Sequence, residues 1–456
     1  MRTKRTALVL LTVFALCFLT HGYVFAREQA TQVTDTTSLS TEQRIMGLMT
    51  VWSEAKYNFP WFDQLPDLNW DATVEAYLPR AIAATDTVEY YRLLMEFAVL
   101  LKDGHTAVRP PWFPFLPTED TLPLEVKIIE DKVIIVAVAD TEEIKKQKVY
   151  PGLEIVTVDK GMPIKTYFQD KVYRYYTAGS EHGNQVWGVF LFFGAKNSIL
   201  DLKVKEMDGR LRTVSLTRNL FSSRIPFAPQ YMRWNVIERN LEVRNMAKGI
   251  LYVRIPSFGI QGIEDEFITM IDGLDLGATK GMVIDLRYNS GGNSAIAEKI
   301  IACLIDKKVS LPIMKYPQYI GAYRAWGKKT QLLESKASTV PRQGKRYLGP
   351  IVVLTGIATA STAEDFAIGL KFAGRALLVG ERTAGSAGNT LSFPLPGGGN
   401  FEVSTFRAYL PDGSEYVHIG VMPDVEVKTT QRDIYKGLEP ILAKGLEIIK
   451  KWPKKS

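Results

Sequence analysis

The sequence predicts a multi-domain α/β protein, because its hydrophobic pattern changes character twice along the chain. Helical periodicity dominates up to about Val108, alternating β-type segments follow from Leu122, and short apolar strands alternate with helical stretches after Lys248. A chain of 456 residues that is 46% hydrophobic and 23% charged has room for roughly two or three domains with their own cores. This composition excludes wholesale disorder, a collagen-like chain and a multispan membrane protein.

Residues 1–26 are predicted to be a secretory signal peptide. Their head is basic, the run Ala7–Thr20 is almost entirely apolar, and Val24 and Ala26 occupy positions −3 and −1 of a cleavage site. The run is short for a transmembrane helix, so an uncleaved anchor is the less favoured alternative. We therefore expect an exported protein, periplasmic or extracellular, with no membrane span once the signal is removed.

The net charge and the small numbers of cysteines and histidines exclude further classes of function. Part of the net charge of +7 belongs to the predicted signal, and the lysines near the C-terminus form a solvated tail, so no nucleic-acid partner is expected. Two cysteines and four histidines exclude a disulfide scaffold and a Cys-rich zinc domain. We find no P-loop or HExxH motif and expect no metal and no cofactor.

Residues 27–112 are predicted to form a helical N-terminal domain. Ser40 and Gln43 are spaced as a capping box that opens a helix through Tyr57. The stretch Tyr90–Leu101 places its large apolar side chains on one helical face, and that helix is expected to end at the sequence Lys-Asp-Gly-His, residues 102–105.

Residues 113–224 are predicted to form a small β domain after a proline-rich linker. Its expected strands are Leu124–Ile129, Val133–Val138, Leu153–Val158, Leu200–Lys205 and Thr213–Thr217. Residues 222–245 are expected to connect it to the next domain.

Residues 225–456 are predicted to form the α/β core. Its apolar strands are expected at Ile250–Ile255, Met282–Leu286, Ile351–Thr355 and Ala376–Val379, with helices including Ala295–Ile305 and Thr362–Phe372. Continuously apolar strands that alternate with helices indicate a buried, largely parallel sheet.

Two turns in this core carry possible chemistry. Gly291 and Gly292 follow a buried strand, so their backbone N–H groups could bind an anion, although a simple strand-to-helix turn fits equally. Ser361 stands at the head of a helix, where the positive end of the helix dipole favours an oxyanion. The spacing of Ser361 and Glu364 also satisfies a purely structural capping box, so this reading stays open.

A serine nucleophile needs a base with a pKa near neutrality, and histidine is the usual one. Outside the predicted signal the chain has only His105, His182 and His418. His105 lies in the motif DGHT. His418 lies near Asp412 and Glu415 in the segment PDGSEYVHIGVMPD.

Taken together, these segments resemble one family. The order of LKDGHT, VIDLRYNSGG, TASTAEDF, GERTAG and GVMPDV is similar to that in the tail-specific (C-terminal processing) serine peptidases, including their tricorn-core relatives. The resemblance implies a helical N-terminal segment, a PDZ-like β domain and a catalytic core of the ClpP/crotonase type. The segment YPGLEIVTVDKGMPI resembles part of the family's PDZ domains.

The resemblance also implies site residues. Ser361 matches the nucleophile, and the amides of Gly291 or Gly292 and of Thr362 match the oxyanion hole. Residues 385–388 hold no lysine, so the chain is closer to the tricorn-like Ser/His branch, in which His105 matches the base. Gly104 departs from that branch, which has a serine there.

The third catalytic member implied by the resemblance is a carboxylate, for which Glu415 is the nearest candidate, with His418 as an alternative. The expected function is a serine-type endopeptidase that cleaves peptides or proteins through an acyl-enzyme, recognising them through their C-termini at the PDZ-like domain. A non-hydrolytic binding protein and an acyl-CoA enzyme of the crotonase type are the alternatives.

Overall fold

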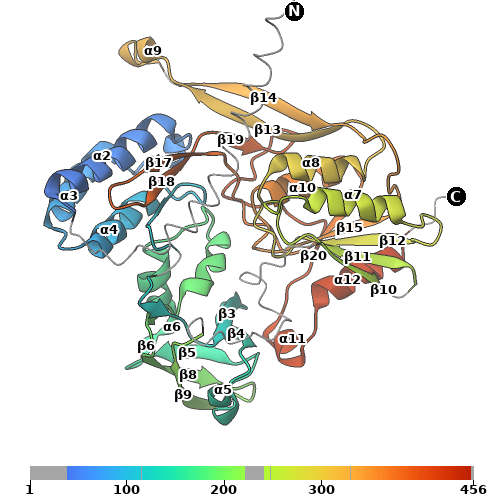
Figure 1. Cartoon of the computed structure of the whole chain (residues 1–456), viewed down its shortest axis with the longest axis horizontal. Coiled ribbons are helices and arrows are strands. Elements are labelled where there is room, and N and C mark those ends of the chain that lie inside the picture. Colours follow the sequence, from blue (N-terminus) through green and yellow to red (C-terminus); the bar gives the residue numbers. More distant parts are fainter. Residues whose placement is uncertain (1–38, 114–115, 221–240, 247, 329, 453–456) are drawn as a thin grey trace, which may run out of the picture.

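The computed structural model describes residues 39–113, 116–220, 241–246, 248–328 and 330–452. The predicted signal peptide lies outside these residues. Figure 1 shows helices α2–α4 on one side, a small β sheet below them, and a sheet covered by helices on the other side. A long β hairpin projects at the top of the same view.

The N-terminal helices are α2 (Thr41–Asn58), α3 (Trp70–Ala83) and α4 (Thr87–Val99). The predicted capping box is present: Ser40 Oγ accepts from the Gln43 N–H at 3.2 Å, and Gln43 Oε1 accepts from the Ser40 N–H at 2.9 Å. The apolar face of α4 is buried, and Phe97 stacks on Trp70 with ring centroids 4.2 Å apart. Helix does not continue to Val108, because β1 (Ala107–Arg109) is a strand paired with a distant segment.

The small sheet has the order β3-β4-β5-β8-β9, with neighbouring strands antiparallel. The strands are β3 (Leu124–Ile129), β4 (Lys132–Val138), β5 (Glu154–Val158), β8 (Ile199–Lys205) and β9 (Leu211–Thr217). Four of the five begin one or two residues away from their predicted starts. Strand β3 forms one edge of this sheet, and the helical turns of η3 (Gly183–Phe190) lie beside it.

The central sheet has the order β10-β11-β12-β15-β16-β20, and every neighbouring pair except β10 with β11 is parallel. Its strands are β10 (Glu242–Met246), β11 (Ile250–Arg254), β12 (Gly281–Asp285), β15 (Ile351–Thr355), β16 (Leu377–Gly380) and β20 (Val425–Glu426). Every residue of β11, β12 and β15 is buried, which explains their continuously apolar sequence.

Helices cover both faces of the central sheet. Alternate strand residues such as Met282 and Ile284 pack in the cluster that includes α7 (Ile263–Gly273), α8 (Ser294–Ala302) and α10 (Thr362–Phe372). The intervening residues, such as Val283, pack against α12 (Pro440–Lys450) on the opposite face. Figure 1 shows these two helical layers above and below the sheet. The predicted bounds of α10 are confirmed, whereas α8 starts one residue early and ends at Ala302.

Two small sheets join the helical part to the core. One has the order β1-β18-β17, with β17 (Thr390–Pro394) and β18 (Asn400–Ser404). The other has the order β14-β13-β19 and contains the projecting hairpin of β13 (Val309–Gln318) and β14 (Gln331–Thr339), with β19 (Arg407–Tyr409). One hydrophobic cluster runs from helices α2–α4 through these sheets to the helices over the central sheet.

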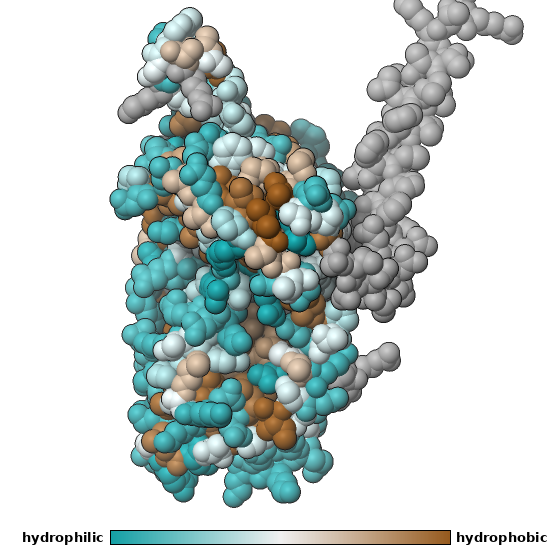
Figure 2. Space-filling view, turned by 90° about the vertical axis from the view of Figure 1, so that its left-hand side faces the viewer, coloured by the Kyte–Doolittle hydropathy of each residue, from teal (hydrophilic) through white to brown (hydrophobic). Residues whose placement is uncertain are grey.

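The remaining elements are short: η1 (Phe62–Gln64), β2 (Glu119–Asp120), α5 (Glu142–Lys146), β6 (Met162–Pro163), α6 (Ile164–Phe168), η2 (Gln169–Tyr173), β7 (Gly194–Ala195), α9 (Gly321–Ala325) and α11 (Gln431–Lys436). Figure 2 shows the face that carries the N-terminal helices and, below them, the small sheet; it is mostly hydrophilic, with a hydrophobic patch in its upper half. Within the described residues, no helix combines the length and apolarity needed to cross a membrane.

Candidate active site

Strand pairing brings the DGHT segment to the core. Strand β1 begins directly after this segment and pairs antiparallel with β18, in the register Ala107 with Glu402 and Arg109 with Asn400. Just before the strand, the Ser404 N–H donates to Thr106 Oγ1 at 3.1 Å. His105 is thereby fixed against a segment about 300 residues further along the chain.

Ser361 stands between strand β15 and helix α10, at the N-cap of the helix. Its backbone has φ 55° and ψ −130°, a conformation that non-glycine residues rarely adopt and that costs about 1–3 kcal/mol. Two hydrogen bonds hold this conformation, because the Ser361 N–H lies 2.7 Å from the Ser386 carbonyl oxygen and 3.1 Å from Glu364 Oε2. Such a turn presents a side chain away from both strand and helix.

The Ser361 hydroxyl lies next to the imidazole of His105. Ser361 Oγ and His105 Nε2 are 3.2 Å apart, and on the other side of the ring His105 Nδ1 is 3.1 Å from Ser386 Oγ. The three side chains form a hydrogen-bonded row in which Ser386 fixes the orientation of the ring. Such a row can move a proton from Ser361 to His105.

The departures of residues 104 and 386 from the family pattern fit one another. A Cβ atom built on Gly104 would lie 2.3 Å from Ser386 Oγ and 3.0 Å from the Ala178 carbonyl oxygen. The Ser386 hydroxyl therefore occupies the space that a side chain at position 104 would need. A glycine before His105 and a serine at position 386 together support the ring.

A buried carboxylate, Asp103, lies behind His105. Asp103 Oδ2 accepts from Thr106 Oγ1 and Ser404 Oγ, each at 2.6 Å, and Asp103 Oδ1 lies 3.4 Å from His418 Nε2. Burial works against its charge, but the hydrogen bond and charge of His418, together with His105 and Ser404, hold the pKa of Asp103 below its usual value. Asp103 thus places a negative charge near His105 without a direct hydrogen bond to it.

The titration of His105 reflects these neighbours. Burial lowers the pKa of His105 below its usual value, the Asp103 charge acts in the opposite direction, and Arg109 lowers it further. The imidazole is consequently neutral at neutral pH. A neutral ring with Nε2 toward a hydroxyl can accept a proton.

Glu364, one turn into α10, ties three segments of the site together. Its carboxylate accepts from the Ser361 N–H, from the Gly385 and Ser386 N–H groups at 2.9 Å each, and from the Thr383 hydroxyl. Burial raises the pKa of Glu364 to about 8, although these hydrogen bonds lower it. The residue holds the Ser361 turn and the Ser386 turn in fixed relative positions.

The predicted anion-binding amides lie beside Ser361. The Gly291 N–H donates to Asn289 Oδ1 at 2.9 Å, whereas neither the Gly292 N–H nor the Thr362 N–H has a hydrogen bond within the described part of the chain. Thr362 Oγ1 donates to the Gly292 carbonyl oxygen at 2.7 Å and joins the two turns. Of the two predicted glycines, Gly292 is therefore the one with a free donor.

A glycine is needed at position 291 for this turn to lie close to the turn that carries Ser361. Its φ is 103°, and a Cβ atom there would lie 2.7 Å from Ser361 Cβ and 3.0 Å from the Thr362 nitrogen. Any other residue would combine backbone strain with a clash against the turn that carries Ser361. The Gly-Gly sequence thus allows two turns from different strands to meet.

The structure does not bring Glu415 into this group. Glu415 is exposed and forms an isolated bridge with Tyr409. The next two residues, Tyr416 and Val417, are buried, so the chain turns inward only after Glu415. His105 Nδ1 instead faces Ser386.

The other two histidines have separate partners. His418 packs against Trp61 with ring centroids 4.9 Å apart and reaches Asp103, while His182 Nε2 lies 2.6 Å from the Thr383 carbonyl oxygen. Of the described histidines, His105 is the one within hydrogen-bond distance of Ser361.

A cavity of about 480 Å³ opens beside Ser361, Thr362 and Gly292. It lies between α8, α10 and β13, and sequence reasoning did not find it. Its lining comes from segments far apart in the chain, so the sequence carried no local signal. Among the described residues, no group of three or more His, Cys, Asp or Glu side chains is placed to hold a metal ion.

Comparison with known proteins identifies the core. Residues 249–427 match the family model described as peptidase family S41. The match covers about two fifths of the chain and shows that the core is similar to this family. The predicted resemblance to the tail-specific serine peptidases is confirmed by this match.

The curated relatives include two C-terminal processing proteases. The carboxyl-terminal-processing protease of Picosynechococcus sp. is 28% identical over 232 residues, which cover 51% of this chain and 49% of that protein. The carboxy-terminal-processing protease of Bartonella bacilliformis is 26% identical over 256 residues, which cover 54% of each chain. The chain thus spans about half the length of these relatives.

Solved structures extend the likeness to the whole fold. Mature CPAF aligns with a TM-score of 0.69 and 18% identity, covering 91% of this chain and 99% of that one. The photosystem II D1 C-terminal processing protease aligns with a TM-score of 0.50 and 20% identity, covering 84% of this chain and 93% of that one. These likenesses support the mixed α/β fold that the sequence predicted.

Proposed function

We propose that this protein is a serine endopeptidase of the tail-specific kind, with Ser361 as nucleophile and His105 as base. The observation that carries the proposal is the row Ser386–His105–Ser361, with separations of 3.1 and 3.2 Å. In the first step His105 Nε2 takes the Ser361 proton while Oγ attacks the scissile carbonyl carbon. Ser386 keeps the ring in the orientation that this transfer needs.

The attack places a negative charge on the carbonyl oxygen. The N–H groups of Gly292 and Thr362 are the donors best placed for it, and the N-terminus of α10 adds the positive end of a helix dipole. Each good donor contributes about 3–4 kcal/mol to transition-state stabilisation. His105 then gives its proton to the leaving amine, which yields an acyl-enzyme on Ser361.

Water completes the cycle. His105 takes a proton from a water molecule that attacks the ester carbon, and the same two amides hold the second oxyanion. The proton returns to Ser361 Oγ as the ester bond breaks and the new carboxylate leaves. The Asp103 charge behind His105 stabilises the imidazolium that forms in both halves of the reaction.

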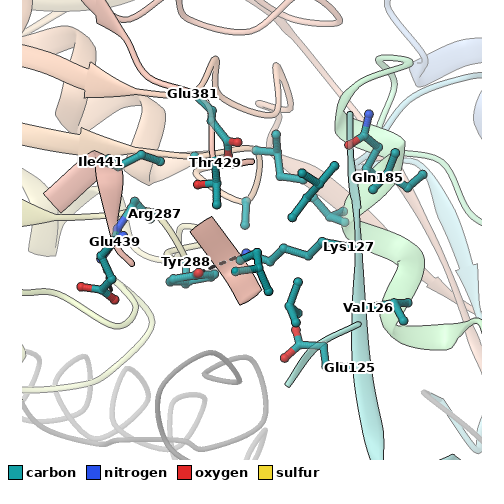
Figure 3. A pocket seen from close by; sticks show the side chains of 18 of the residues that line it. Glu125, Val126, Lys127, Gln185, Arg287, Tyr288, Glu381, Thr429, Glu439 and Ile441 are labelled. Atoms are coloured by element: carbon teal, nitrogen blue, oxygen red, sulfur yellow. Dashed lines mark hydrogen bonds and ion pairs between the residues drawn. The ribbon is translucent and has the colours of Figure 1, made fainter. Parts of the chain in front are cut away.

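We propose that the small β sheet is the PDZ-like unit and receives substrate as an added strand on the edge of β3. A pocket lies where that edge meets the core, lined by Glu125, Val126 and Lys127 of β3. Figure 3 shows Lys127 reaching Tyr288, with Nζ 3.0 Å from the phenol oxygen. Because Tyr288 directly precedes the turn with Gly291 and Gly292, an occupied β3 edge is in contact with the oxyanion segment.

We further propose that the protein acts outside the cytoplasm on peptides or proteins recognised through their C-termini, with no nucleic-acid partner. The basic, apolar leader over residues 1–26 supports export. The support for protein substrates is the S41 match and the two processing-protease relatives.

Labelling with a fluorophosphonate tests the proposed chemistry. The reagent forms a bond from Ser361 Oγ to phosphorus with loss of fluoride, so we expect one adduct, mapped to Ser361 by mass spectrometry. Ser361→Ala should abolish the adduct, while Ser290→Ala, on a neighbouring exposed residue, should retain it. Failure of a folded protein to react would favour a non-hydrolytic binding protein on the same fold.

A further inference from the structure

The cavity beside Ser361 has a definite position relative to the reaction. Its wall includes Ser361 itself and the two residues with free amides, Gly292 and Thr362, but not His105. His105 must protonate the leaving amine, so the leaving half of a substrate lies on the histidine side. The cavity is therefore on the acyl side and faces the side chain of the residue that supplies the scissile carbonyl.

Apolar side chains make up a large part of the cavity wall, beside polar residues such as Asn293 and Asn389. Residues from three elements provide the apolar part: Ala297 and Ile301 of α8, Leu311 and Met314 of β13, and Phe366 of α10, with Phe406 and Ala408 nearby. Such a wall suits an aliphatic chain. Taken alone, it would favour residues such as leucine or norleucine.

Two carboxylates break this apolar lining. Glu298 lies on α8 among the residues that face the cavity, and Asp365 lies on α10 one helical turn after Ser361. Asp365 Oδ1 accepts from the buried Tyr416 hydroxyl at 3.0 Å. Neither carboxylate is paired with a cation in the described part of the chain, and no lysine, arginine or histidine is among the residues lining the cavity.

The two carboxylates are electrostatically unfavourable together. Burial raises the pKa of Asp365 to about 6, with the Glu298 charge contributing in the same direction. Burial also raises the pKa of Glu298. A cation that entered the cavity would relieve both effects, since a positive charge favours the ionised form of each group.

The separation of Ser361 and Asp365 along α10 suits a long cationic side chain. One turn of α10, about 5.4 Å, separates Ser361 from Asp365, and an extended lysine or arginine side chain spans a similar length. Its methylene stem would pack on the apolar wall while its head reaches the carboxylates. We infer that this cavity selects lysine or arginine as the residue on the carbonyl side of the cleaved bond, with Glu298 and Asp365 as its specificity-determining residues.

This inference rests on the proposed function, and peptidyl phosphonate probes separate the two. Ser361 Oγ bonds to phosphorus, one phenoxide leaves as phenol, and His105 relays the proton. Three diphenyl phosphonates carrying 4-aminobutyl, butyl or 2-carboxyethyl side chains mimic lysine, norleucine and glutamate at the same position. Second-order labelling rates are measured for the full chain, with fluorophosphonate as a reference that needs no side chain.

In the wild-type protein the lysine probe should react about tenfold or more faster than the norleucine probe, the size expected for a hydrogen bond to a charged group, and the glutamate probe slowest. Glu298→Gln should bring the lysine-to-norleucine ratio down by about tenfold. Glu142→Gln, at an exposed position on α5, is the matched control and should keep the wild-type ratio. The lysine-to-norleucine ratio is also measured on the wild-type protein alone, so this part of the test does not depend on the folding of any variant.

Equal or faster labelling by the norleucine probe would overturn the inference, as would an unchanged ratio in folded Glu298→Gln. If fluorophosphonate modifies Ser361 but none of the three probes does, the cavity does not take this substrate residue and the inference also fails. If fluorophosphonate does not react either, the proposed function itself is wrong.

Discussion

The hydrogen-bonded row of Ser361, His105 and Ser386 and the cavity beside it are built in opposite ways. Around Ser361, His105 and Ser386, the polar side chains are hydrogen bonded to one another, and Glu364 locks the turns that carry the two serines. In the cavity, the carboxylates of Glu298 and Asp365 lack a cation among the described residues. The first arrangement fixes a proton path, whereas the second leaves charge for a substrate to neutralise. Changes in the row should lower turnover of every substrate, and changes in the cavity should alter the ranking of substrates.

The largest expected effect separates His105 from His418. His105→Ala removes the proposed base and should lower kcat/KM by roughly 10⁴-fold or more. His418→Ala, which loses only the contact to Asp103 and the packing on Trp61, should cost about 10- to 100-fold, because it disturbs the residues behind the base. Peptidase assays on both variants, with circular dichroism to verify folding, make the comparison. A larger loss for His418→Ala would reverse the assignment.

The next effect concerns the fit between Gly104 and Ser386. Gly104→Ala should displace the Ser386 hydroxyl, since the new Cβ would lie 2.3 Å from it, and should lower kcat by about 10- to 100-fold. Adding Ser386→Gly should recover protein stability but not full activity, because the ring loses its orienting hydroxyl. Thermal denaturation and steady-state kinetics are measured on both variants.

Gly273→Ala is the matched control for that pair, because the space around position 273 is open and its backbone is helical. It should leave kcat unchanged. Wild-type activity in Gly104→Ala would show that the row does not depend on the position of Ser386.

The pH dependence of kcat/KM should show a smaller effect, in a direction that the electrostatics around His105 predict. His105 must be neutral to act as base, and burial holds its pKa below the usual value of about 6.5, so kcat/KM should begin to fall only below that pH. Asp103→Asn removes the charge that raises the pKa of His105, so it should move this acid limb to still lower pH. A limb above pH 6.5, or one that moves upward in Asp103→Asn, would contradict the described electrostatics.

The smallest expected effect lies at the β3 edge. Lys127→Met removes the contact from β3 to Tyr288 and should change kcat/KM for long peptides by a few-fold, while leaving fluorophosphonate labelling of Ser361 unchanged. An equal change in both measurements would mean that Lys127 acts on the serine itself rather than on peptide binding.

Local sequence patterns predicted many of the strands and helices of this protein. The buried strands and helix α10 are specified by continuous apolar runs and by helical periodicity, and Ser361 could be placed at the head of α10 from those alone. The proposed base followed from the scarcity of histidine and from the family motif. Each of these signals lies within a short stretch of sequence.

Local sequence patterns could not predict which residues contact His105. Ser386 meets His105 across 281 positions, and the contact depends on β1 pairing with β18. Glu415 was chosen as the carboxylate nearest ahead of the GVMPD segment, but it lies exposed on the surface, while Tyr416 and Val417 after it are buried. The cavity escaped prediction for the same reason, because α8, α10 and β13 line it only once they have folded together.

The roles of Ser361 as nucleophile and His105 as base are tested by the rate of fluorophosphonate labelling at Ser361, followed against pH in the wild type and in His105→Ala. We expect wild-type labelling to lose rate only below about pH 6.5, and His105→Ala to label at least about 100-fold more slowly across the whole range. Labelling of His105→Ala at the wild-type rate, or an adduct on another residue, would contradict these roles.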